Sequence, residues 1–148
     1  MHNGQIGGWQ TIRRQVEALI PDAIYAGRQG TTDSEAILLA ALAHGLEDEP
    51  EAAMAETLGR VHGMMERAGI AAPLRFTAAL TDGADLWAFR WASDGKPATL
   101  YWKHDNAGLI VVSEPIDGHR EDWEAIPVGG CVIAPAGGPV RVASLMAA

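Results

Sequence analysis

Two short polar motifs near the start of the sequence contain the residue types that could carry chemistry. The first, His2-Asn3-Gly4, places a carboxamide NH2 beside a glycine N–H that no Cβ obstructs. Two donors aimed at one oxygen can stabilise the charge of an acyl-transfer intermediate, and losing one such donor typically costs on the order of 10²–10³ in rate. Asn-Gly is also a favoured turn dipeptide, so a simple tight turn is the alternative interpretation.

The second motif, Thr32-Asp33-Ser34-Glu35, has the Thr-x-x-Glu spacing of a helix capping box. An apolar run follows, so the sequence predicts that a helix begins here. Asp33 then falls in its first turn, where a carboxylate interacts favourably with the helix dipole. Asp33 could in addition face a cleft and hold a substrate ammonium through a charge-assisted hydrogen bond.

In their order and spacing, these motifs resemble the glutaminase domain of class II glutamine amidotransferases, a branch of the N-terminal nucleophile hydrolases. The resemblance implies that Asn3 and Gly4 form the oxyanion hole and that Asp33 binds the α-amino group of glutamine. It also places the adjacent His2 and Thr32 among the substrate-binding residues. The implied substrate is a small molecule, glutamine or a γ-glutamyl compound, and the sequence shows no cofactor motif.

Four later segments are similar to the small amidotransferase-like amidohydrolases, which include the γ-glutamyl hydrolase of ergothioneine biosynthesis and a glutathione-degrading enzyme. These segments are Thr81-Asp82-Gly83, the run from Leu86 to Trp91, Ser113-Glu114-Pro115 and the run from Trp123 to Pro127. The resemblance therefore covers nearly the whole chain. Ser113-Glu114 ends a predicted strand, where it could face the cleft or cap the following turn.

The sequence departs from this family at the nucleophile. Members begin with a Cys whose α-amine acts as the base, and an Arg-containing motif ahead of His-Asn-Gly holds the substrate carboxylate. This sequence starts at Met1-His2, and neither residue is an acyl acceptor of that type. We therefore expect the C-terminal portion of a glutaminase domain, lacking an N-terminal segment and inactive alone. The alternative is a non-catalytic binding or structural domain, or a subunit that pairs with a nucleophile-bearing chain.

Other residues offer less chemistry. Cys131 is the single cysteine and lies among Val and Ile in a predicted strand, where a cysteine usually acts as a small core residue. The five histidines show no paired spacing typical of zinc ligands, so no metal site is predicted. Lys103-His104-Asp105 is predicted as an exposed polar turn. Tyr25 and Arg28 lie in a connection, residues 22–30, that could reach the cleft.

Composition argues against several classes of partner. The net charge is −8, with 11 scattered basic residues, whereas nucleic-acid binding requires clustered Lys and Arg. The longest apolar run, Ala36 to Ala43, is shorter than the roughly 18–20 residues that cross a bilayer, and the N-terminus has no signal-peptide pattern. No membrane partner is therefore expected. One cysteine precludes an internal disulfide, which is typical of a cytoplasmic protein.

The elements that must position the motifs are helices first and strands afterwards. Apolar spacing predicts helices over 9–20, 33–46 and 50–68, with Ile37, Leu38, Ala41 and Leu42 on the buried side of the second. Alternation then predicts a hairpin of strands 74–80 and 86–91. Further strands are predicted over 99–103, 109–112, 131–134 and 140–143, and the apolar strand 109–112 is expected to be buried on both faces.

This order indicates a single α+β domain over residues 1–148. The resemblance implies the α-β-β-α sandwich of N-terminal nucleophile hydrolases, incomplete in this chain. Because an incomplete sandwich has unpaired strand edges and uncovered apolar faces, we expect homo-oligomerisation or low stability.

Overall fold

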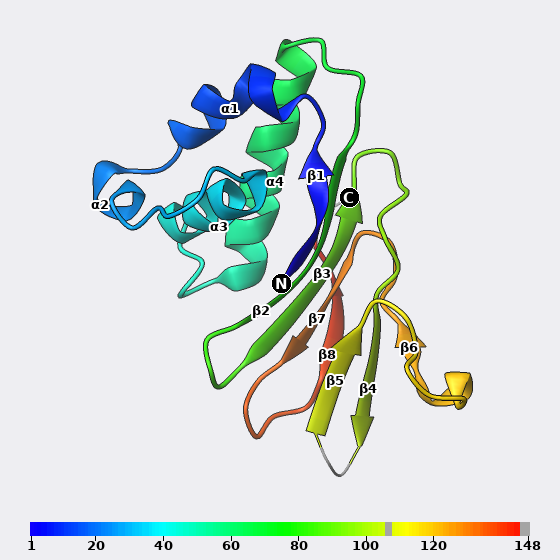
Figure 1. Cartoon of the computed structure of the whole chain (residues 1–148). Coiled ribbons are helices and arrows are strands. Elements are labelled where there is room, and N and C mark those ends of the chain that lie inside the picture. Colours follow the sequence, from blue (N-terminus) through cyan, green and yellow to red (C-terminus); the bar gives the residue numbers. More distant parts are fainter. Residues whose placement is uncertain (106–107, 146–148) are drawn as a thin grey trace. The chain divides into compact units, whose positions relative to one another are not determined.

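The computed structural model describes residues 1–105 and 108–145, which form two compact units. The sheet unit comprises Met1–Gly4 and the residues from Arg75 onward, and the helical unit comprises Gln5–Leu74 (Figure 1). Strand β1 (His2–Ile6) begins in the sheet unit and ends in the helical unit. The sequence did not predict this strand, because polar residues and a glycine interrupt any apolar alternation.

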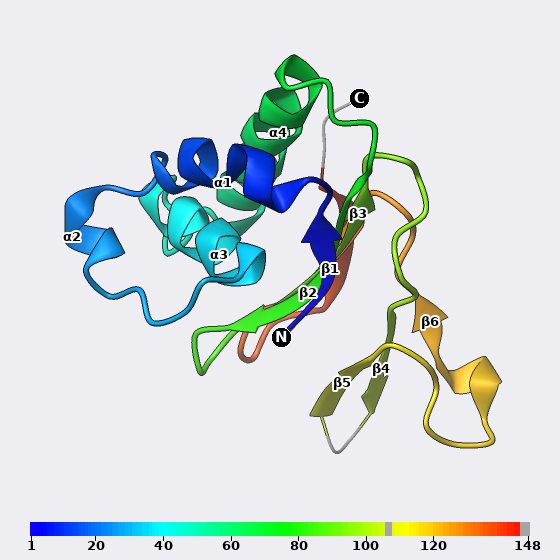
Figure 2. The same cartoon turned by 45° about the horizontal axis from the view of Figure 1, so that its top comes forward.

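The helical unit contains α1 (Trp9–Glu17), α2 (Asp22–Tyr25), α3 (Asp33–Ala43) and α4 (Pro50–Arg67). Helices α1, α3 and α4 pack on one another, and the short α2 lies against α3 (Figure 2). Their contact surfaces are mainly apolar, and Thr57 of α4 is a buried polar residue. The fully buried side chains include Ile12 and Val16 of α1, Ile37 of α3, and Leu58 and Val61 of α4.

The three predicted helices are confirmed with shorter ends. Helix α1 ends at Glu17 rather than at residue 20, and α3 ends at Ala43 because Gly45 adopts a left-handed φ of 89°. The predicted burial of Leu38 is wrong, since this side chain is 39% exposed. Helix α3 is apolar on all sides, so its pattern does not define the buried face. Its core face consists mostly of alanines around Ile37.

The sheet unit contains β2 (Leu74–Thr81), β3 (Leu86–Ala92), β4 (Tyr101–Asp105), β5 (Gly108–Val112), the 3-10 turn η1 (Arg120–Asp122), β6 (Glu124–Ala125), β7 (Gly130–Ala134) and β8 (Arg141–Ser144). One sheet has the strand order β1-β2-β3-β7-β8, and a smaller one has the order β5-β4-β6. Strands β2 and β3 pair antiparallel, with Thr81 opposite Leu86 at one end of the register and Arg75 opposite Ala92 at the other. This pairing confirms the predicted hairpin. The two sheets meet at a buried cluster.

That cluster consists of Ala88, Leu100, Ile126 and Val132, against which Trp102 and Val111 of the smaller sheet pack. Strand β5 lies at the edge of this sheet and Ile110 is 39% exposed, so the predicted burial on both faces is wrong. Lys103-His104-Asp105 forms the end of β4 rather than a turn. The sequence pattern shows an apolar run but not which neighbours cover it.

The fold thus mixes helices and antiparallel sheet, with every α-helix of the described residues lying before Ala68. None of these helices combines the length and apolar character that crossing a bilayer requires.

Candidate functional site

Asn3 and Gly4 lie in β1, at the edge of the five-stranded sheet, so the tight-turn interpretation is wrong. Met1 and Ala79 exchange both backbone hydrogen bonds, at 2.8 and 2.9 Å, as opposed residues of antiparallel strands do. A Cβ at position 4 would collide with the carbonyl oxygen of Arg75. Only glycine permits this close approach of the two backbones.

The Asn3 side chain is exposed, and its carboxamide makes no hydrogen bond within residues 1–105 and 108–145. Its NH2 group is therefore open to an external acceptor. The ring of His2 is half-buried, with its centroid 4.9 Å from that of Phe76 in β2. His2 Nε2 lies 2.7 Å from the position that a Cβ on Gly4 would take. The first motif thus forms the start of β1, which packs closely on β2 and leaves the side-chain amide of Asn3 open.

The second motif begins α3 as predicted. Thr32 is the N-cap, and its Oγ1 accepts a hydrogen bond from the Glu35 N–H at 3.3 Å. Asp33 lies in the first turn and accepts two further bonds, from the Ser34 N–H at 2.9 Å and from the Ile6 N–H at 2.7 Å. Because an ionised carboxylate offers about four acceptor positions, Asp33 keeps capacity for an ammonium ligand.

Glu35 does not return the capping-box bond to the N-cap residue. Its two carboxylate oxygens instead accept the backbone N–H groups of Gln29 and Gly30, each at 2.7 Å. Glu35 therefore fixes the loop that precedes the motif. The spacing correctly predicted the Thr32 cap but could not predict which N–H groups the glutamate would bind.

Arg28 joins this loop to two helices. Its side chain is only 6% exposed, with Nη1 2.5 Å from the Glu17 carboxylate of α1 and Nε 3.7 Å from that of Glu35. Arg28 Nε also donates to the Gly30 carbonyl at 2.9 Å, and the guanidinium lies 5.4 Å from the centre of the Tyr25 ring. Tyr25 and Arg28 are thus bound into the helical unit. The sequence offered them only as loop residues.

Electrostatics in this cluster favour the charged forms. A hydrogen bond from Arg13 lowers the pKa of Glu17, burial opposes the shift, and Arg28 lowers it further. Burial alone would lower the pKa of Arg28, but its bonds and charge interaction with Glu17, together with Tyr25, raise it. Both shifts favour the charged forms of Glu17 and Arg28, which lie in one cluster with Arg13 and Glu35.

The structure gathers the motif residues into two groups. Thr32, Asp33 and Glu35 are joined to the loop before α3 and to Ile6 in the helical unit, whereas His2, Asn3 and Gly4 lie in the sheet unit. Of the remaining candidates, Cys131 is fully buried in β7 opposite Phe89, which confirms its interpretation as a core residue.

Glu114, whose role the sequence left open, accepts a hydrogen bond from the Thr99 hydroxyl at 2.6 Å. Within the described part of the chain, no three His, Cys, Asp or Glu side chains gather in an arrangement suited to a metal ion.

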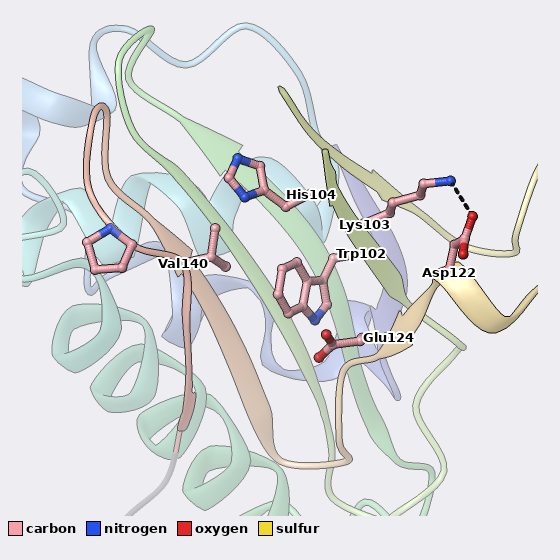
Figure 3. Close-up of a pocket in the computed structure, with 7 residues that line it drawn as sticks. Trp102, Lys103, His104, Asp122, Glu124 and Val140 are labelled. Carbon is pink, nitrogen blue, oxygen red and sulfur yellow. Dashed lines mark hydrogen bonds and ion pairs between the residues drawn. The ribbon is translucent and has the colours of Figure 1, made fainter. Parts of the chain in front are cut away.

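A cavity of about 410 Å³ opens in the sheet unit, in a region that the sequence did not single out as a site (Figure 3). Its lining comprises Trp102, Lys103 and His104 of β4, Asp122 of η1, Glu124 of β6, and Pro139 and Val140 before β8. Lys103 and His104 were expected in an exposed turn. They lie instead in β4, where they line the cavity together with Asp122 and Glu124.

No known family profile matches the chain, and no curated protein matches it either. Among solved structures, the chain is similar to a glutamine aminotransferase class-II domain protein from Silicibacter pomeroyi, with 37% sequence identity and a TM-score of 0.89. The alignment covers 97% of this chain and 65% of the length of that protein. This similarity supports the resemblance to class II glutamine amidotransferases that the two motifs indicated.

Proposed function

We propose that this chain is the C-terminal portion of a glutaminase-type amidohydrolase domain of the class II glutamine amidotransferase family. Its substrate is the γ-amide of glutamine or of a γ-glutamyl compound, and its nucleophile is an N-terminal Cys, which the present sequence does not contain. The observation that carries the proposal is the 37% identity to a class-II domain protein over 97% of the chain. The proposal includes the α-β-β-α sandwich of N-terminal nucleophile hydrolases as the fold of the whole domain.

The residues then take defined roles. The Cys thiolate attacks the γ-carbonyl carbon, and the π electrons move to the oxygen, which accepts hydrogen bonds from the Asn3 NH2 and the Gly4 N–H. Collapse of this intermediate expels the amine, which takes up a proton, and leaves a thioester that water hydrolyses. Asp33 binds the substrate α-ammonium through its remaining acceptor positions.

The open carboxamide of Asn3 and the partly used carboxylate of Asp33 support these roles. His2 and Thr32 are the other proposed substrate-binding residues: His2 lies beside Gly4, and Thr32 caps the helix that begins at Asp33. The proposal involves no cofactor or metal. The proposed localisation is the cytoplasm, the proposed partner is a small-molecule substrate, and the proposed assembly includes a homo-oligomer.

The test compares hydrolysis of glutamine and γ-glutamyl amides by this chain and by a form extended upstream to an in-frame Met-Cys. We expect activity only in the extended form. In that form, Asn3→Ala should lower kcat by about 10²–10³. Asp33→Ala should mainly raise KM, because it removes an interaction made in the bound substrate as well as in the transition state.

Asp48→Ala is the matched control, since Asp48 is an exposed carboxylate beyond the end of α3. It should leave both constants unchanged. Hydrolysis by the present chain would refute the assignment of the nucleophile. Silence of both forms, with both folded, would instead favour the non-catalytic binding or structural domain.

A further inference from the structure

The cavity in the sheet unit combines an aromatic wall with carboxylates. Trp102 of β4 lies directly opposite Glu124 of β6 in the strand register, and His104 follows two residues later on the same face of β4. Figure 3 shows the indole nitrogen of Trp102 on the side of Glu124. Val140 and Pro139 add an apolar wall. A volume of about 410 Å³ suits a small molecule.

The positive charge of Lys103 is already balanced. Its Nζ donates to Asp122 at 3.1 Å, lies 3.6 Å from a carboxylate oxygen of Asp117, and stands 5.7 Å from the centre of the Trp123 ring. The hydrogen bond to Asp122 is the main cause that raises the pKa of Lys103, against the effect of burial. An anionic ligand would therefore have to compete with two carboxylates for this ammonium.

Glu124 has no such partner. Its carboxylate makes no ion pair and no side-chain hydrogen bond among residues 1–105 and 108–145. The indole Nε1–H of Trp102 is buried and likewise lacks an acceptor in this part of the chain. Glu124, which is exposed, gives the cavity a carboxylate without a counter-ion among the described residues, beside a large aromatic side chain. Carboxylates and aromatic faces both attract organic cations.

We propose that this cavity binds a small organic cation, whose ammonium or guanidinium group is held by Glu124 and whose apolar stem packs on Trp102 and Val140. A bare metal ion is disfavoured, because the described side chains offer no cluster of three metal-ligating groups. The site is separate from the proposed glutaminase chemistry and does not depend on it.

The experiment titrates the whole chain with agmatine, which carries a guanidinium and an ammonium on a four-carbon stem, by calorimetry and by NMR of the indole N–H signals. Trp102→Phe identifies the Trp102 signal. We expect saturable binding that shifts this signal and weakens with added salt. Butyrate and 1-butanol, of similar stem length but without the cation, should not bind.

Glu124→Gln should weaken agmatine binding by about tenfold or more, because a hydrogen bond to a charged group is lost. Glu121→Gln is the matched control, since Glu121 is an exposed carboxylate of η1, 3.7 Å from His119, and does not line the cavity. It should bind agmatine as the parent chain does. Absence of saturable binding, or equal weakening in both variants, would overturn the proposal, provided that both variants melt like the parent.

Discussion

The two motifs are held in place by different physical means. At the start of α3, the chain uses hydrogen bonds: Asp33 accepts the N–H of Ile6, Glu35 accepts those of Gln29 and Gly30, and Thr32 accepts that of Glu35. At the start of β1, it uses steric fit, since Gly4 allows the backbone of β2 to approach while the Asn3 carboxamide remains without a protein partner within the described residues.

This difference matches the roles proposed for the two motifs. A carboxylate that orients a charged substrate benefits from a fixed position, and the bonds that Asp33 accepts from backbone N–H groups supply one. An oxyanion donor must instead keep its N–H groups free for the substrate, so its position has to come from the strand that carries it.

Gly4→Ala should be the most destabilising single change, because the added methyl group collides with the Arg75 carbonyl and the strands cannot separate without losing ladder bonds. We expect a loss of about 3 kcal/mol in the free energy of unfolding, measured by urea denaturation. Gly59→Ala is the matched control. Gly59 lies exposed in α4 with open space around it, so alanine should stabilise by about 0.5–1 kcal/mol. A Gly4→Ala protein as stable as the parent would contradict the predicted collision with the Arg75 carbonyl.

Arg28→Met should cost less, about 2 kcal/mol, because it removes charged hydrogen bonds while Arg13 still neutralises Glu17 at 2.6 Å. Arg60→Met is the matched control, since Arg60 forms an exposed i,i+4 pair with Glu56 and should change stability by less than about 0.5 kcal/mol. Hydrogen exchange of the backbone amides of Gln29 and Gly30 should accelerate only in Arg28→Met. Equal losses of unfolding free energy in the two variants would show that the buried ion pairs of Arg28 stabilise the chain no more than an exposed pair does.

The sequence predicted the second motif better than the first for a physical reason. Capping is a local interaction, so residue types three positions apart predict the start of α3 and the bond from Glu35 to Thr32. The place of Gly4 depends on Arg75, more than seventy residues away, and no local pattern contains that contact. The sequence therefore left two interpretations of Asn3 and Gly4 open, a tight turn and an oxyanion hole, and did not predict the strand that contains them.

The same distinction explains the other differences. Helix α4 and the hairpin of β2 and β3 follow from short-range periodicity and are confirmed. The exposure of Leu38 and Ile110 and the cavity around Trp102 depend on which distant elements cover them. The Arg28 cluster was also missed, although Glu17 and Glu35, one on each side of Arg28 in the sequence, offered a signal.

Thr32→Ala should lower the free energy of unfolding by about 1 kcal/mol, since the N-cap side chain satisfies one helix N–H. Thr31→Ala, at the preceding exposed residue, should have almost no effect. Circular dichroism of the two variants should show a loss of helix stability in Thr32→Ala but no change in the sheet. If both alanine variants unfold at the same urea concentration, the cap does not stabilise α3.

The smallest effect should appear only at acid pH. The pKa of Glu17 is lower in the folded chain than its ordinary value, mainly through the hydrogen bond from Arg13, so its ionisation favours the folded state. This contribution is complete above the pKa of the unfolded chain and is lost as pH falls through the lowered pKa of the folded chain. Glu17→Gln should therefore flatten the fall of unfolding free energy with decreasing pH. Parallel curves for parent and variant from neutral to acid pH would show that Glu17 is not the group responsible, and the buried Arg28 would then need another counter-charge.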